Sequence, residues 1–187
     1  MATVSEGAGR IIVGVSTSLP GLQALRIAVT LARVRGGGGL LAVRSWQLPV
    51  LAAAEPVAVA LAYQLEYDAE EIITEAFAAA MGGAPADIEI SCLAVHGSAS
   101  HAVLSQTGSA HDMVVLGAPV GGSRRMYQSK TVRTCLRYAP CPIVIVPPPE
   151  FAGRARLGLL GQGLRREVER ITRQLRHGLP DQPISGR

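Results

Sequence analysis

The sequence predicts a doubly wound α/β fold, in which a five-stranded parallel sheet carries helices on both faces. Five short apolar runs, rich in β-branched residues, alternate along the chain with longer amphipathic segments. The runs lack polar alternation, which is typical of parallel strands buried on both faces. Alternating strands and helices indicate right-handed crossovers in one sheet.

The first strand and helix have clear boundaries. Residues 11–15 form the first apolar run, and Ser18 with Pro20 then provides an N-cap and a first-turn proline. Residues 36–39, all glycine, end the helix. Its predicted buried face consists of Leu22, Leu25, Ala28, Val29 and Ala32.

The next elements are a strand over 40–46, a long helix over about 56–80 and a strand over 88–95. Gly82 and Gly83 close the long helix. Its predicted apolar seam is Leu61, Leu65, Ala69, Ile72 and Ala76.

The last elements are a short helix from Gly97-Ser98 to about 104, a strand over 112–117, a second short helix and a strand over 142–146. Three prolines at 147–149 end the last strand. The predicted inner face of the second short helix is Val132, Cys135 and Leu136.

The composition divides the chain into a flexible N-terminus at 1–9, an α/β domain at 10–148, and a proline-rich linker with an arginine-rich amphipathic helix at 149–187. The helix, over 163–179, would pack on the domain, on a second copy or on another protein. Its seam is Leu164, Val168, Ile171, Leu175 and Leu179.

Composition and charge exclude several classes. With 187 residues and 48% hydrophobic side chains, the chain is not disordered. Residues 1–149 hold ten basic and ten acidic side chains, so the net charge of +4 belongs to the C-terminal segment. With only seven aromatic residues, the composition argues against base stacking, and so against nucleic-acid binding as the main function.

We expect a cytoplasmic protein without a membrane segment or a metal site. Glu55 and Pro56 interrupt the most apolar stretch, and residues 1–10 do not resemble a signal peptide. Cys92, Cys135 and Cys141 form no C-x-x-C pair, which favours reduced thiols.

The candidate binding site follows the first and fourth strands, because ligands of open α/β sheets lie at the carboxyl ends of the strands. Ser16, Thr17 and Ser18 follow the first strand. The segment after the fourth strand contributes glycines, hydroxyls and cations, which together suit a phosphate-binding loop; a plain surface loop is the alternative. The candidate residues of this segment are Gly117, Gly121, Gly122, Ser123, Arg124, Arg125, Ser129, Lys130 and Thr131.

Residues 136–146, Leu-Arg-Tyr-Ala-Pro-Cys-Pro-Ile-Val-Ile-Val, together with 11–15 and 112–117, resemble the universal stress protein domain over about residues 9–147. The resemblance implies a Rossmann-like fold of the adenine nucleotide alpha hydrolase type with sheet order 3-2-1-4-5. It also implies binding of ATP or AMP, with Mg²⁺ accompanying ATP, and a homodimer through the last strand at 142–147.

Nucleotide-binding members of that family carry the pattern Gly-x2-Gly-x9-Gly-Ser/Thr after the fourth strand. Here the first glycine matches Gly117, and the second falls on Val120 or Gly121. The final pair falls on Ser129 and Lys130, in a segment one residue shorter than the pattern.

Two further positions are implied by the resemblance. The family's first-strand aspartate matches Ser16, flanked by Val15 and Thr17, and Ser45 matches the position whose backbone meets the adenine. Ser16 supplies neither the charge nor the metal affinity of an aspartate, whereas Lys130 offers a cation for phosphate.

The sequence therefore predicts an adenine-nucleotide-binding stress-response regulator that acts by association. The alternative is a dimeric interaction module with a decayed pocket that contacts its partner through 163–179. No general base or nucleophile stands out, so we do not expect an enzyme; nucleotide hydrolysis is the third alternative.

Overall fold

The computed structural model describes residues 9–49, 57–118 and 129–149. The chain divides into two units, residues 1–149 and 150–187, and all described residues belong to the first. The elements are β1 (Ile11–Gly14), α1 (Leu19–Arg35), β2 (Leu40–Trp46), α2 (Val57–Met81), β3 (Ile90–His96), α3 (Ala99–Leu104), β4 (Met113–Gly117), α5 (Lys130–Tyr138) and β5 (Ile143–Val146).

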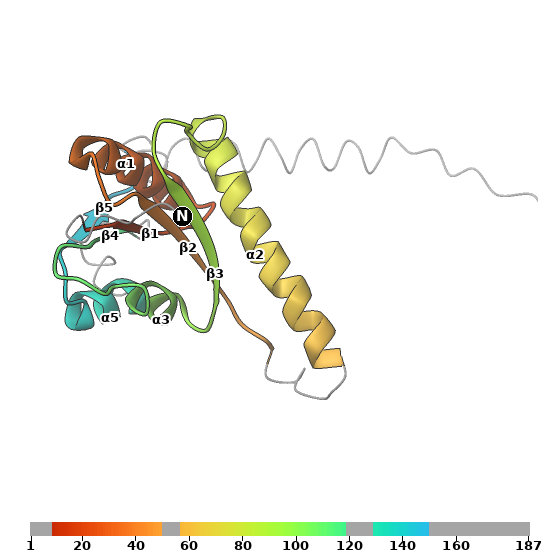
Figure 1. Ribbon diagram of the computed structural model, residues 1–187. Coiled ribbons are helices and arrows are strands. Elements are labelled where there is room, and N and C mark those ends of the chain that lie inside the picture. Colours follow the sequence, from red (N-terminus) through yellow and green to blue (C-terminus); the bar gives the residue numbers. More distant parts are fainter. Residues whose placement is uncertain (1–8, 50–56, 119–128, 150–187) are drawn as a thin grey trace, which may run out of the picture. The chain divides into compact units, whose positions relative to one another are not determined.

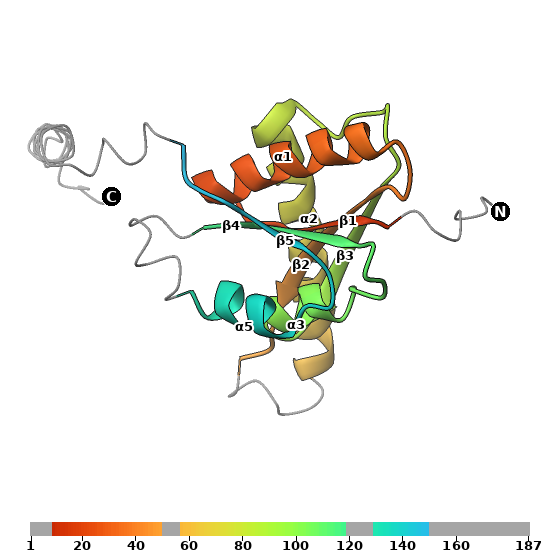
Figure 2. The same ribbon diagram turned by 90° about the vertical axis from the view of Figure 1, so that its left-hand side faces the viewer.

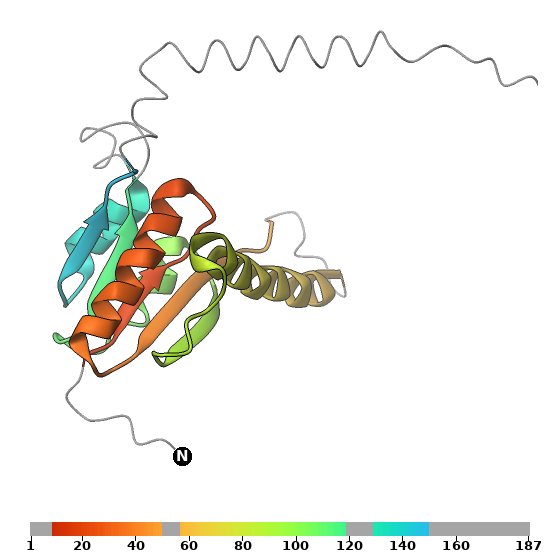
Figure 3. The ribbon, with the colours of Figure 1, turned by 90° about the horizontal axis from the view of Figure 1, so that it is seen from above.

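The five strands form one parallel sheet in the order β3-β2-β1-β4-β5, which confirms the predicted fold class and strand order. Strand β1 is central, and Ile12 lies opposite Leu41 of β2 and Val114 of β4. Seen from above, the strands fan out beneath α1, with β5 at one edge (Figure 3). The chain thus changes winding direction at β1, between β2 and β4.

Helices cover both faces of the sheet, as predicted. Helices α1 and α2 lie on one face, and α3 and α5 lie on the other (Figure 2). Alternate residues of each strand point to opposite faces, so that Ile11 joins the core under α1 and α2 while Ile12 joins the core over α3 and α5. The two apolar clusters fix the strand ends in place at the candidate site.

The capping predictions for the helices are confirmed. The Ser18 hydroxyl accepts a hydrogen bond from Gly21 N at 3.3 Å, and Gly36 ends α1 in the left-handed region at φ 65°. Ser98 caps α3 in the same way, accepting from His101 N at 3.3 Å. Local sequence chemistry therefore determines where these helices begin and end.

Three predictions of detail are wrong. Strand β3 begins at Ile90, two residues later than predicted, because the preceding segment is a turn. In α2 the isoleucine that is fully buried is Ile73, whereas the predicted Ile72 is half-buried. Leu136 is 47% exposed, because it lies about 100° around α5 from the fully buried Cys135.

Helix α2 extends past the edge of the sheet (Figure 1). Val59, Tyr63 and Tyr67 lie exposed at four-residue spacing on its outer side. Although α2 has 25 residues, no helix in the described ranges combines the length and apolar character that a bilayer span needs.

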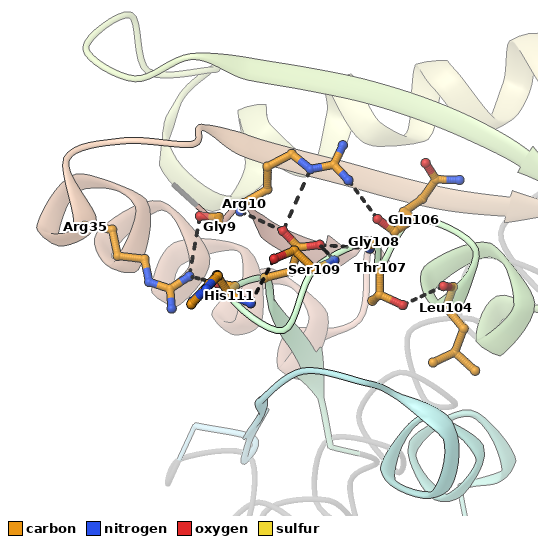
Figure 4. Close-up of polar contacts among 10 residues, drawn as sticks. Gly9, Arg10, Arg35, Leu104, Gln106, Thr107, Gly108, Ser109 and His111 are labelled. Atoms are coloured by element: carbon orange, nitrogen blue, oxygen red, sulfur yellow. Dashed lines mark hydrogen bonds and ion pairs between the residues drawn. The ribbon is translucent and has the colours of Figure 1, made fainter. Parts of the chain in front are cut away.

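A buried carboxylate ties the turn before β4 to the start of β1 (Figure 4). Asp112 is 3% exposed, and its two oxygens accept hydrogen bonds from Arg10 N at 2.9 Å, Gly108 N at 2.9 Å and Ser109 N at 3.0 Å. The Arg10 side chain adds a 4.0 Å ion pair to the same carboxylate. This network lies at the amino ends of the strands, away from the candidate site.

Backbone contact closes the same end of the sheet. Gly9 lies so close to the His111 carbonyl that a Cβ at Gly9 would overlap the carbonyl oxygen. The Arg35 guanidinium donates to that carbonyl oxygen at 2.9 Å and so attaches the end of α1 to the turn.

Candidate functional site

A cavity of about 210 Å³ lies at the carboxyl ends of β1, β2 and β4, where the winding direction changes. The three strand ends supply one wall, and α3 and the first turn of α5 supply the other. Its lining residues are Gly14, Val15, Ser16, Gly21, Val43, Arg44, Ser45, Ala99, Ala102, Val103, Leu116, Gly117, Ser129, Thr131 and Val132.

Six predicted site residues line this cavity together: Val15, Ser16, Ser45, Gly117, Ser129 and Thr131. Thr17 and Lys130 are exposed and lie outside the lining. Outside the described residues lie the other positions predicted after β4, which are Val120, Gly121, Gly122, Ser123, Arg124 and Arg125.

The turn after β1 is organised by its hydroxyls. Ser16 Oγ and Ser18 Oγ share a hydrogen bond of 2.7 Å, and Ser18 N donates to Ser16 Oγ at 3.4 Å. Gly21 packs against the same serine, because a Cβ at Gly21 would overlap Ser16 Oγ. The Ser16 hydroxyl is thus part of the structure that begins α1, at the position where the family pattern has an aspartate.

Gly117 at the end of β4 is in close contact with the first turn of α1. A Cβ at this position would stand 2.6 Å from the Pro20 carbonyl oxygen and 2.8 Å from Gly21 N. Only a residue without a side chain allows this strand end to lie against that backbone. The glycine predicted for phosphate binding therefore also has a packing role.

The amino end of α5 faces the same cavity. Ser129 is the N-cap and accepts from Val132 N at 3.4 Å, and Thr131 in the first turn lines the cavity. The first turn contains no acidic residue. The free N–H groups and the helix dipole make this end favourable for an anion.

Sequence reasoning missed two important positions in the site. Gly14 opens the cavity floor, since a Cβ there would stand 2.9 Å from Leu116 Cδ2 and 3.4 Å from Val103 Cγ2. Arg44 lines the cavity, and its Nη1 donates to the Val15 carbonyl oxygen at 3.0 Å. The sequence signal that could have identified Gly14 is its position as a single glycine within a β-branched strand, which indicates that another group packs closely against the backbone there.

The described lining suits an anion better than a metal ion. It provides serine and threonine hydroxyls and one arginine, and it includes no carboxylate. Across the described ranges, no group of three His, Cys, Asp or Glu side chains is arranged to hold a metal. Because Mg²⁺ takes hard oxygen ligands, usually with carboxylates, these residues do not fit a protein-held Mg²⁺.

Of the two thiols near the last strand, Cys135 is fully buried and Cys141 is half-buried. Burial raises the pKa of Cys135 to about 11, and it also raises the pKa of Cys141. Both side chains belong to the core packed between the sheet and α5. A thiol of raised pKa is a poor nucleophile at neutral pH.

The chain is a doubly wound α/β protein with a cavity at the switch point, the place where proteins of this architecture bind their ligands. The model of the universal stress protein family matches residues 7–147. The chain belongs to this family. No curated relative matches the sequence.

Solved universal stress proteins are similar in fold. That of Lactobacillus plantarum, UspA, is 19% identical, with a TM-score of 0.56 over 74% of this chain and 97% of that one. One from Archaeoglobus fulgidus in complex with dAMP is 17% identical, with a TM-score of 0.43 over 74% and 97%. One in complex with cAMP is 15% identical, with a TM-score of 0.48 over 76% and 98%.

Proposed function

We propose that the protein binds an adenine nucleotide, AMP or ATP, in this cavity and acts as a stress-response regulator through association. The observation that carries the proposal is the cavity itself, where six residues predicted from three separate sequence segments come together at the switch point. Membership of the universal stress protein family supports the same ligand class.

The parts of the site suit different parts of a nucleotide. The cavity, at about 210 Å³, is smaller than the ~300–1,000 Å³ of most ligand pockets, so it would enclose only part of a nucleotide, and we assign it to the nucleoside end. The apolar side chains of Val43, Val103 and Leu116 would contact the base, and the backbone at Ser45 would form hydrogen bonds with the edge of the adenine. The phosphates would extend towards Ser129 and the amino end of α5, where N–H groups favour anions.

A first prediction tests this proposal by filling the cavity. AMP at about 100 times its Kd should stabilise the protein by about 2.7 kcal/mol, a rise in Tm of ~5–11 °C. In Gly14→Val the new methyl groups occupy the floor beside Leu116 and Val103, so this gain should disappear. Thermal unfolding with and without AMP measures both values.

The matched control is Gly108→Ala, which adds a methyl group where nothing lies within 4 Å of the new Cβ. It should keep the whole nucleotide-dependent rise in Tm. If the wild-type protein shows no rise with AMP or ATP at millimolar concentration, the proposal fails and the interaction module with a decayed pocket is favoured.

The proposed association is a homodimer through β5. This strand lies at the sheet edge, and its four residues, Ile-Val-Ile-Val, carry no charge. Three of the four are only half-buried. An uncharged apolar edge strand with unpaired backbone groups is suited to pair with another strand.

A second prediction concerns this edge. Val144→Lys places a cation at the middle of β5, and in a symmetric strand pair the two cations would repel each other, so the dimer should dissociate. Val59→Lys is the control, because Val59 is 51% exposed on α2, which packs on β2 and β3. Sedimentation analysis of the three proteins should give a dimer, a monomer and a dimer. A wild-type monomer would contradict the proposal.

The proposal includes a cytoplasmic location and a partner for the C-terminal segment. Cys92, Cys135 and Cys141 are free thiols, which suits a reducing compartment. The helix predicted over 163–179 lies outside the described residues, so its contact with a partner rests on its apolar seam and arginine content alone.

A further inference from the structure

We propose that this site binds the nucleotide's phosphates as a free anion, without a divalent cation. The inference rests on the proposed function, and it departs from the metal-bound ATP that the family resemblance implies. What carries it is the sign of the charges that the fold brings to the cavity.

The segments that build the cavity contain no acidic residue. The sequence has none between Glu6 and Glu55, which spans β1, α1 and β2, and none between Asp112 and Glu150, which spans β4, α5 and β5. The remaining lining residues come from α3 and are apolar; they are Ala99, Ala102 and Val103. The described part of the lining therefore offers no carboxylate to bridge a phosphate through a metal ion.

Positive charge takes the place of the metal. The Arg44 guanidinium lies 3.0 Å from the Val15 carbonyl oxygen, at the carboxyl end of β1. The amino ends of α1 and α5, marked by Gly21 and Ser129, both lie on the cavity. Neither helix has an acidic residue in its first turn to offset the positive end of its dipole.

The residue at the position of the family's aspartate is not available as a strong ligand. Ser16 Oγ is hydrogen-bonded to Ser18 Oγ at 2.7 Å, within the turn that begins α1. A neutral hydroxyl in such a bond adds little to the binding of Mg²⁺, which prefers anionic oxygen. Phosphate charge is instead balanced by the guanidinium and the backbone N–H groups.

A cationic site responds to Mg²⁺ in a direction opposite to that of a metal site. Mg²⁺ bound to ATP cancels two of its negative charges, and so reduces its attraction to the site. We expect Mg²⁺ to weaken ATP binding or to leave it unchanged. AMP, which holds Mg²⁺ weakly, should bind equally with and without it.

Isothermal titration calorimetry of the full chain tests this with ATP, AMP and inorganic triphosphate, each in EDTA and in excess Mg²⁺. Binding of ATP in EDTA, with a Kd that rises or stays constant in Mg²⁺, supports the inference. A Kd for ATP that falls tenfold or more in Mg²⁺ overturns it. If triphosphate binds in EDTA and neither nucleotide does, the proposed function fails while the metal-free anion site stands. If nothing binds in EDTA but ATP binds in Mg²⁺, the inference fails and the proposed function stands. If nothing binds in either buffer, both fail.

A pair of variants gives the converse test. Ser16→Asp restores the acidic group of the family pattern, so ATP binding in EDTA should weaken about tenfold and Mg²⁺ should then strengthen it. Thr17→Asp adds the same charge one residue along, at an exposed position outside the lining, and should change the Kd less than threefold. Equal effects of the two variants would contradict the inference.

Discussion

Replacing Gly117 with alanine is expected to lower the free energy of unfolding by about 3 kcal/mol, at the upper end of the range for overpacking. The new Cβ would lie 2.6 Å from the Pro20 carbonyl oxygen, 2.7 Å from its carbon and 2.8 Å from Gly21 N. All three atoms are backbone, so relief requires the end of β4 to move away from α1. The Tm should fall by ~6–12 °C.

Urea denaturation of Gly117→Ala beside Gly108→Ala measures this cost. Gly108 lies in the turn before β4, where an added Cβ has nothing within 4 Å. Its backbone N–H donates to Asp112, and alanine keeps that donor. The control should change stability by no more than ~1 kcal/mol. If Gly117→Ala is equally mild, the close approach of β4 to α1 does not constrain the fold.

This packing role changes how the glycine pattern is interpreted. Gly117 matches the first glycine of the phosphate-binding pattern, yet its contact with α1 already requires glycine. A loss of nucleotide binding in Gly117→Ala would therefore follow from either role. Gly14→Val is the better probe, because the side chains that the new methyl groups meet, Leu116 and Val103, line the cavity itself.

Much of the fold is predictable because its signals are local. Ser18 and Ser98 cap helices through hydrogen bonds to backbone three residues away, and Gly36 ends a helix with a left-handed turn. Such signals need no knowledge of the rest of the chain. The strand order followed from the family resemblance of residues 136–146 and not from local signals.

Details that depend on packing were not predictable in the same way. The exposure of Leu136 depends on how narrowly α5 contacts the sheet, and the choice of Ile73 over Ile72 depends on how α2 is rotated. In the sequence, Ile72 and Ile73 are identical neighbours, and Leu136 and Cys135 are both apolar. Only the tertiary contacts decide which member of each pair is buried.

In the candidate site, too, some residues are predictable from local sequence signals and others are not. Ser16 and Ser129 were found because they follow a strand or begin a helix, which places them at the carboxyl edge of the sheet. Arg44 and Ala102 lie in the middle of elements, and they reach the cavity only through strand pairing and the position of α3. No local sequence signal distinguishes such residues from ordinary strand and helix positions.

Asp112 gives the second large effect. Although burial raises its pKa, the N–H groups of Gly108, Arg10 and Ser109 lower it by more, so the pKa lies below its usual value. Asp112→Asn replaces one accepting oxygen by an N–H group that faces these donors. With the side chain 4% exposed, we expect a loss of about 3 kcal/mol at neutral pH.

The same group makes stability depend on pH in a defined direction. Because its pKa is lower in the folded than in the unfolded protein, Asp112 stabilises the fold fully above the unfolded value and loses this contribution as the pH falls through the folded one. The difference in unfolding free energy between wild type and Asp112→Asn should therefore be constant from about pH 7 to about pH 5 and shrink towards about pH 3.

Urea denaturation of both proteins across that range measures the difference, with Glu75→Gln on the exposed side of α2 as the control. The control should stay within ~0.5 kcal/mol of wild type at neutral pH. A wild-type advantage over Asp112→Asn that persists undiminished at about pH 3 would show that the carboxylate's charge does not hold the amino ends of β1 and β4 together. The hydrogen bonds would then stabilise equally well through a neutral oxygen.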